Sequence, residues 1–69
     1  MIEFKLNSEY IALCDCLKIN GVAASGGQAK AMIAEGSVTV DGQTELRKTA
    51  KIRAGQMIEC LGETIHVTA

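Results

Sequence analysis

Residues 25–42 read SGGQAKAMIAEGSVTVDG and contain the signals of a helix, a strand and the turns that end them. Ser25 can cap the helix, and Gln28 follows three positions later, which is the spacing of a capping box. Apolar residues then recur at i, i+3 and i+4, on one helix face: Ala29, Met32 and Ile33. Gly36 can take the left-handed conformation that commonly ends a helix. The stretch therefore predicts a short helix between Ser25 and Gly36.

A strand and a tight turn are expected directly after this helix. Residues 37–40, SVTV, alternate with a period of two, as in a strand with one buried face. Asp41 and Gly42 come next and are a strong signal for a type I′ hairpin turn, in which both central residues have positive φ. Residues 43–46 are then expected to return antiparallel to residues 37–40.

The segment before this stretch predicts another strand and another helix. Residues 3–6 alternate and are expected to form a short edge strand. From Glu9 the pattern is helical, because apolar residues fall on one stripe: Tyr10, Leu13, Cys14 and Leu17. Residues 20–21, Asn-Gly, would end this helix. Since the connector to Ser25 is short, the two helices are expected to pack as neighbours.

Beyond residue 46 the chain reads as strands and turns. Lys51-Ile52-Arg53 alternates, so Ile52 is expected to face the core while both cations face water. Two further strands are expected, each after a turn: residues 57–60 after 54–56, and residues 64–67 after 62–63. The fold class is therefore α+β, with two short helices packed on a small, mostly antiparallel sheet. Residues 1–69 are too few for more than a single domain.

Composition and charge restrict the function. The hydrophobic fraction of 48% is too high for an unstructured tail. The net charge is −1, so the molecule as a whole does not attract a polyanion. One short stretch nevertheless collects four cations and no acid: Arg47, Lys48, Lys51 and Arg53. A concentrated basic patch on a nearly neutral protein can steer an anionic partner to that patch. The alternative is that these cations only keep a loop and an edge strand in contact with water and prevent aggregation.

The other reactive side chains predict neither a metal site nor catalysis. Three cysteines do not make a complete disulfide framework, so we expect buried, reduced thiols. One residue separates Cys14 from Cys16, which does not suit structural zinc, and we expect no cofactor. His66 is the only histidine and accompanies no nucleophile motif, so we expect no enzyme. No apolar run could cross a bilayer, which predicts a cytoplasmic protein that does not bind membranes.

A combination of short motifs resembles a known family. Residues 29–33, AKAMI, are followed by Gly36 and by the hairpin signal of residues 38–42, with Gly-Gln further on at residues 55–56. This combination lies within residues 10–60 and resembles the S4 RNA-binding domain, or αL motif. The length of the chain is most similar to the small stand-alone bacterial proteins of that family.

The resemblance implies binding of structured RNA, such as ribosomal or transfer RNA, through the helical pair and the adjoining hairpin. By position, the RNA-binding residues would lie at the start of the second helix and in the basic stretch: Ser25, Gln28, Lys30, Arg47, Lys48, Lys51 and Arg53. Many family members have a basic residue directly after the serine, where this chain has glycines at 26–27. Backbone amides at a helix start can still bind a phosphate.

These residues are expected to form one positive face, with the basic stretch folded back beside the second helix and Lys30. Recognition is expected to use shape and phosphate contact, because Tyr10 is predicted to lie on the apolar helix stripe and base stacking needs an available aromatic. We expect a ribosome-associated monomer, with an additional protein partner left open. The alternative is a protein-interaction or ribosome-assembly adaptor that keeps the fold with little RNA affinity, which the net acidity favours.

Overall fold

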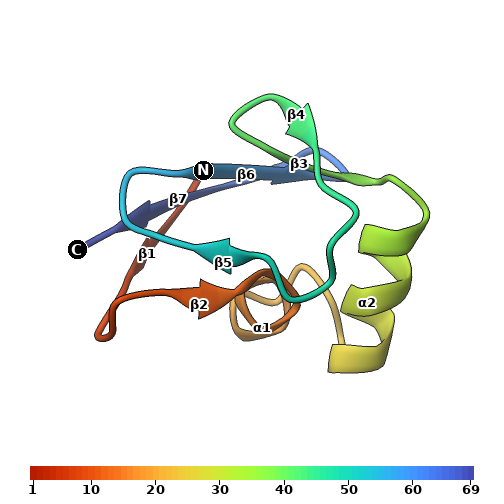
Figure 1. Cartoon of the computed structure of the whole chain (residues 1–69), viewed down its shortest axis with the longest axis horizontal. Helices are drawn as coiled ribbons and strands as arrows, with labels where there is room; N and C mark the ends of the chain where they lie inside the picture. Colours follow the sequence, from red (N-terminus) through yellow and green to blue (C-terminus); the bar gives the residue numbers. More distant parts are fainter.

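A five-stranded sheet with both helices on one of its faces forms the frame of the molecule (Figure 1). The computed structural model describes all 69 residues. The elements in chain order are β1 (Ile2–Lys5), β2 (Ile11–Ala12), α1 (Leu13–Ile19), α2 (Gly26–Ala34), β3 (Val38–Val40), β4 (Gln43–Thr44), β5 (Lys51–Ile52), β6 (Met57–Cys60) and β7 (Glu63–Thr68).

The strand order of the main sheet is β1-β7-β6-β3-β4. β1 runs parallel to β7, and all other neighbours in this sheet are antiparallel. β2 and β5 form a separate antiparallel ribbon, which lies on the same side of the sheet as the helices in Figure 1. The predicted α+β class, with two short helices on a mostly antiparallel sheet, is confirmed.

The α2 helix begins and ends almost as its sequence predicts. The Gln28 amide donates to the Ser25 hydroxyl at 3.1 Å, which is the first half of a capping box. The Gln28 side chain reaches back one residue further than predicted, because its oxygen accepts from the amide of Ala24. At the other end Gly36 has a φ of +85°, and the residue after it donates to the carbonyl of Met32. This Schellman pattern satisfies the last carbonyls of the helix.

The predicted start of the first helix at Glu9 is wrong. Residues 11–12 are extended and pair with β5, and α1 begins only at Leu13. The first two amides of α1 donate to carbonyls outside the helix. The Leu13 amide donates to the Ala50 carbonyl at 2.9 Å, and the Cys14 amide donates to the Lys48 carbonyl at 3.1 Å. Because a helix start must find partners for its free amides, this distant segment sets where α1 can begin.

Tight turns join β3 to β4 and β6 to β7. Asp41 and Gly42 have φ values of 51° and 84°, as the type I′ prediction requires. The Asp41 carboxylate also accepts from the amide of Met57 at 2.9 Å, which ties the β3–β4 turn to β6. β4 covers only residues 43–44 and is shorter than predicted. The turn between β6 and β7 lies at residues 61–62, one position earlier than predicted.

The core lies between the sheet and the helices and is entirely apolar. Its fully buried side chains come from every layer of the fold: Leu13, Cys16, Leu17, Ile33, Val38, Ile52, Ile58, Ile65 and Val67. All three cysteines are buried and free, as predicted. Burial raises the pKa of the Cys16 thiol to about 11 and also raises that of Cys60, so both remain protonated at neutral pH.

Replacement of Gly42 by valine is expected to destabilise the fold by about 1–2 kcal/mol, because a β-branched residue is strained at positive φ. The matched control is Gly27→Ala in the first turn of α2. A Cβ there would lie 3.9 Å from the Ser25 hydroxyl oxygen, an ordinary contact, so this change should stabilise by about 0.5 kcal/mol. Urea denaturation of both variants measures the difference. Equal midpoints for Gly42→Val and the parent would contradict the assigned turn.

Candidate nucleic-acid interface

The four clustered cations lie on the β2–β5 ribbon and the loop before it. We call residues 47–53 the basic segment. Ala12 pairs with Lys51, and Ile11 pairs with Ile52, which is only 1% exposed. The alternation predicted for this strand is thus confirmed, since Ile52 enters the core while Lys51 and Arg53 remain at the surface.

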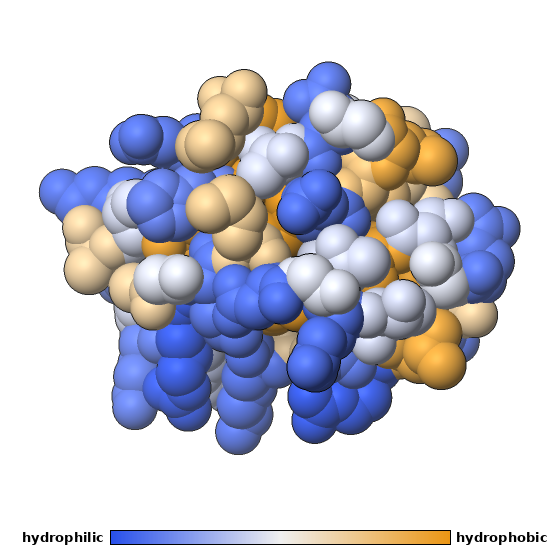
Figure 2. Space-filling view, turned by 90° about the horizontal axis from the view of Figure 1, so that it is seen from above, coloured by the Kyte–Doolittle hydropathy of each residue, from blue (hydrophilic) through white to orange (hydrophobic).

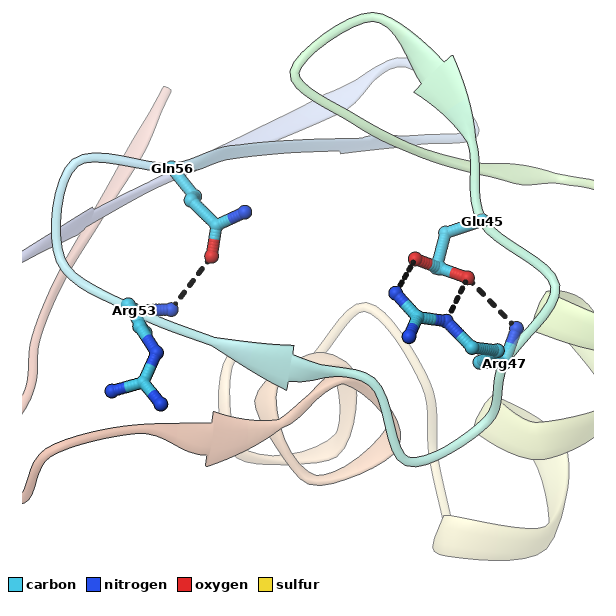
Figure 3. Close-up of polar contacts among 4 residues, drawn as sticks. All are labelled: Glu45, Arg47, Arg53 and Gln56. Carbon is cyan, nitrogen blue, oxygen red and sulfur yellow. Dashed lines mark hydrogen bonds and ion pairs between the residues drawn. The ribbon is translucent and has the colours of Figure 1, made fainter.

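Backbone hydrogen bonds attach the basic segment to the start of α1. The Lys48 and Ala50 carbonyls accept from the first two amides of that helix. Further along, the Arg53 amide donates to the Gln56 side-chain oxygen at 2.7 Å, and Figure 3 shows the Arg53 guanidinium pointing away from that bond. The segment is therefore held along its length while its cationic side chains remain at the surface.

An open pocket of about 490 Å³ lies on this segment and is lined by Arg47, Thr49, Ala50 and Lys51. Two cations and a hydroxyl are groups that bind phosphate oxygens. Figure 2 views the molecule from the sheet side, and long hydrophilic side chains project along the lower edge of that view. This edge corresponds to the front of Figure 1, where β5 lies.

Arg47 is not a free cation, because Glu45 binds it from two residues away. The guanidinium donates through Nη2 to Oε1 at 2.9 Å and through Nε to Oε2 at 3.1 Å, and the Arg47 amide donates to the same carboxylate at 3.0 Å (Figure 3). These bonds lower the pKa of Glu45 to about 2. A phosphate would have to compete with Glu45 for this guanidinium. Glu45 was not among the predicted site residues, although an acid two residues before an arginine is a visible signal in the sequence.

The prediction that Tyr10 lies on a buried helix stripe is wrong. Tyr10 is 42% exposed, because the chain is still extended at this position and becomes helical only at Leu13. The ring faces two cations of the basic segment, with Lys51 Nζ 5.0 Å and Arg53 Cζ 5.7 Å from the ring centroid. Both distances lie within the range of cation–π attraction. The Arg53 guanidinium also lies 3.4 Å from the carboxylate of Glu9.

The remaining predicted residues are the N-cap of α2 and two residues within that helix. The side-chain oxygens of Ser25 and Gln28 accept hydrogen bonds from backbone amides at the start of that helix. Lys30 is exposed in its first turns. The hydrogen bonds of the basic segment run to β2 and α1, and the expected shared face with Lys30 on α2 stays a prediction. The structure thus joins the cations to Tyr10. RNA contact by each of the seven residues stays a prediction.

The other chemistry of the chain is limited. No three His, Cys, Asp or Glu side chains gather where they could hold a metal ion. Neither helix has the length and apolar character needed to pass through a membrane. The basic segment with Tyr10 is the constellation that the structure offers for recognition of a partner.

Comparison with known proteins identifies the class of this fold. The sequence matches the family model of the S4 domain over residues 4–68, and the chain belongs to this family. The resemblance seen in the sequence motifs is therefore confirmed. Two relatives match over 70 residues at 47% identity, with 100% of both chains covered. They are YbcJ of Escherichia coli (strain K12), whose name presents it as a candidate RNA-binding protein, and the uncharacterised YbcJ of Shigella flexneri.

A solved structure agrees with this assignment. The solution structure of Escherichia coli YbcJ matches with a TM-score of 0.78 at 47% identity, and the match covers 100% of this chain and 89% of that one. That structure is described as revealing an αL motif involved in RNA binding.

Acid titration should reveal the Glu45–Arg47 pair. The folded pKa of Glu45 is about 2, below its ordinary value of 4.5, so the pair stabilises the fold fully above pH 4.5 and loses this effect as the pH falls toward 2. We expect an NMR titration of the Glu45 carboxyl to show a midpoint near 2 in the parent. In Arg47→Gln the midpoint should move toward 4.5. A parent midpoint already near 4.5 would show that the pair does not form in solution.

Proposed function

We propose that this chain binds structured RNA, such as a ribosomal or transfer RNA hairpin, through phosphate contacts of the basic segment. The observation that carries this proposal is the attachment of a cationic segment to β2 and α1, with Lys48, Lys51 and Arg53 exposed. Membership of the S4 family and the RNA-binding motif described for Escherichia coli YbcJ support it.

Phosphate contact suits the geometry of this segment. Its backbone is already hydrogen-bonded to neighbouring elements, so binding would order side chains more than backbone, and the entropic cost is small. RNA helices are recognised mostly by shape and by phosphate and 2′-hydroxyl contacts, which lysine and arginine can supply. The low net charge makes the attraction local to this segment. We propose a cytoplasmic binding module that acts without catalysis or cofactor.

Fluorescence anisotropy of labelled ribosomal RNA hairpins, titrated with the protein at several salt concentrations, tests this proposal. We expect log affinity to fall linearly with log salt, with a slope of about −0.7 to −0.9 for each phosphate neutralised. Failure to bind any hairpin at low salt would contradict RNA binding and would favour the adaptor alternative. Affinity that does not change with salt would contradict the phosphate-contact mode.

A further inference from the structure

Tyr10 is an aromatic residue that the core does not use. The chain has no tryptophan, one phenylalanine and one tyrosine. Phe4 packs against the core, whereas Tyr10 is absent from the core and 42% exposed. Tyr10 differs from the other exposed apolar residues because its ring lies next to two cations, and its exposed surface is accessible to a partner.

The position of this ring is fixed by the ribbon. Tyr10 directly precedes β2, and continuing the β2–β5 register places it opposite Arg53. The Ser8 hydroxyl donates to the Tyr10 carbonyl at 2.8 Å, which holds the backbone just before the strand. Lys51 and Arg53 lie on the same side of β5, and both approach the ring within 6 Å of its centroid. One aromatic and two cations therefore lie together on a paired backbone.

This combination is the one that proteins use for unpaired RNA bases. Such bases stack on aromatic side chains while nearby cations bind the backbone phosphates. A purely structural role for Tyr10 would be to hold the two cations by cation–π attraction. With both cations in place, 42% of the residue is still exposed, so a base can reach Tyr10 as well. Stacking was not expected from the sequence, because Tyr10 and Phe4 are the only aromatics and Tyr10 was predicted to lie on the apolar helix stripe.

We propose that Tyr10 stacks on an unpaired RNA base while Lys51 and Arg53 bind the phosphates beside it. The preferred RNA is then a hairpin loop, a bulge or a junction with a single strand, rather than an uninterrupted duplex. This inference rests on the proposed function, because it specifies which kind of structured RNA the same surface selects.

Tyrosine fluorescence gives a direct test, because Tyr10 is the only tyrosine and no tryptophan masks it. The probes are an RNA hairpin with unpaired adenines in its loop and a fully paired RNA duplex of equal length. Binding is followed separately by the anisotropy of a label on the RNA. We expect the hairpin to quench Tyr10 fluorescence on binding, and the duplex to bind more weakly without quenching.

Two variants separate stacking from positioning of the cations. Tyr10→Leu keeps an apolar side chain and removes the ring, so it should weaken hairpin binding about tenfold and leave duplex binding unchanged. The slope of log affinity against log salt should stay the same, because no phosphate contact is lost. Tyr10→Phe keeps the ring and should bind both RNAs like the parent. The melting temperature of each variant checks that the fold is intact.

The measurements on the parent and on Tyr10→Leu distinguish failure of the stacking inference from failure of the proposed function. If Tyr10→Leu weakens both RNAs equally and flattens the salt slope, Tyr10 only positions Lys51 and Arg53, and the stacking inference is overturned. If the parent binds duplex as tightly as hairpin and Tyr10→Leu changes neither, stacking is also overturned while the proposed function stands. If the parent binds neither RNA at low salt, the proposed function itself fails.

Discussion

A variant in which Lys48 and Lys51 are both alanine is expected to bind an RNA hairpin roughly 25- to 60-fold more weakly than the parent at 0.1 M salt. Each neutralised phosphate contributes about 0.7 to 0.9 to the slope of log affinity against log salt, so two contacts account for this loss. The slope should become less steep by about 1.4 to 1.8. Lys48 and Lys51 are chosen over Arg47 because Glu45 already occupies the Arg47 guanidinium.

The fold should tolerate these two substitutions. Both residues are exposed, and the hydrogen bonds that hold the segment use backbone atoms, which alanine keeps. The matched control replaces Glu59 and Glu63 by alanine, two exposed charges on β6 and β7 outside the basic segment. We expect the control to keep the affinity and the salt slope of the parent. If the variant that lacks Lys48 and Lys51 binds like the parent at every salt concentration, the basic segment is a water-exposed edge that does not contact RNA.

Leu17→Ala is expected to unfold most of the protein at 25 °C. Leu17 is fully buried in α1, and removal of a buried leucine side chain costs about 2–5 kcal/mol. A core in a chain of this length rarely supplies more than about 3–5 kcal/mol of net stability. The loss therefore approaches the whole free energy of unfolding.

Leu46→Ala is the matched control for this substitution. Leu46 is 59% exposed in the loop before the basic segment, so the same chemical change should alter stability by less than about 0.5 kcal/mol. Urea denaturation followed by circular dichroism compares the two variants with the parent. A Leu17→Ala midpoint equal to that of Leu46→Ala would contradict the placement of α1 over the core.

Local signals predicted the centre of the fold correctly. The Ser25 cap, the glycine stop at Gly36 and the turn at residues 41–42 each depend on residues a few positions apart, and all three are present. The burial of Ile52 followed from alternation over three residues. In each case the structure depends on the residue type at one position or within a few positions, such as a serine that caps an amide or a glycine that allows a positive φ.

Distant pairing could not be predicted in the same way. The apolar stripe of residues 10–17 is compatible with one longer helix, and only the pairing of residues 11–12 with residues 51–52 makes its beginning a strand. The choice between helix and strand at residues 11–12 is therefore decided by residues some forty positions away. Local propensity does not include such distant partners. The exposure of Tyr10 follows from the same pairing. The pairing therefore adds Tyr10 to the candidate site, next to Lys51 and Arg53.

NMR mapping of the surface that contacts RNA tests the central claim most directly. A labelled sample of the intact chain is titrated with a ribosomal RNA hairpin, and the shift of every backbone amide is followed. We expect the largest shifts on Tyr10 and on residues 47–53, with smaller ones at residues 25–30. Shifts confined to the open sheet face, around Thr39, Glu59 and Thr64, would contradict the central claim.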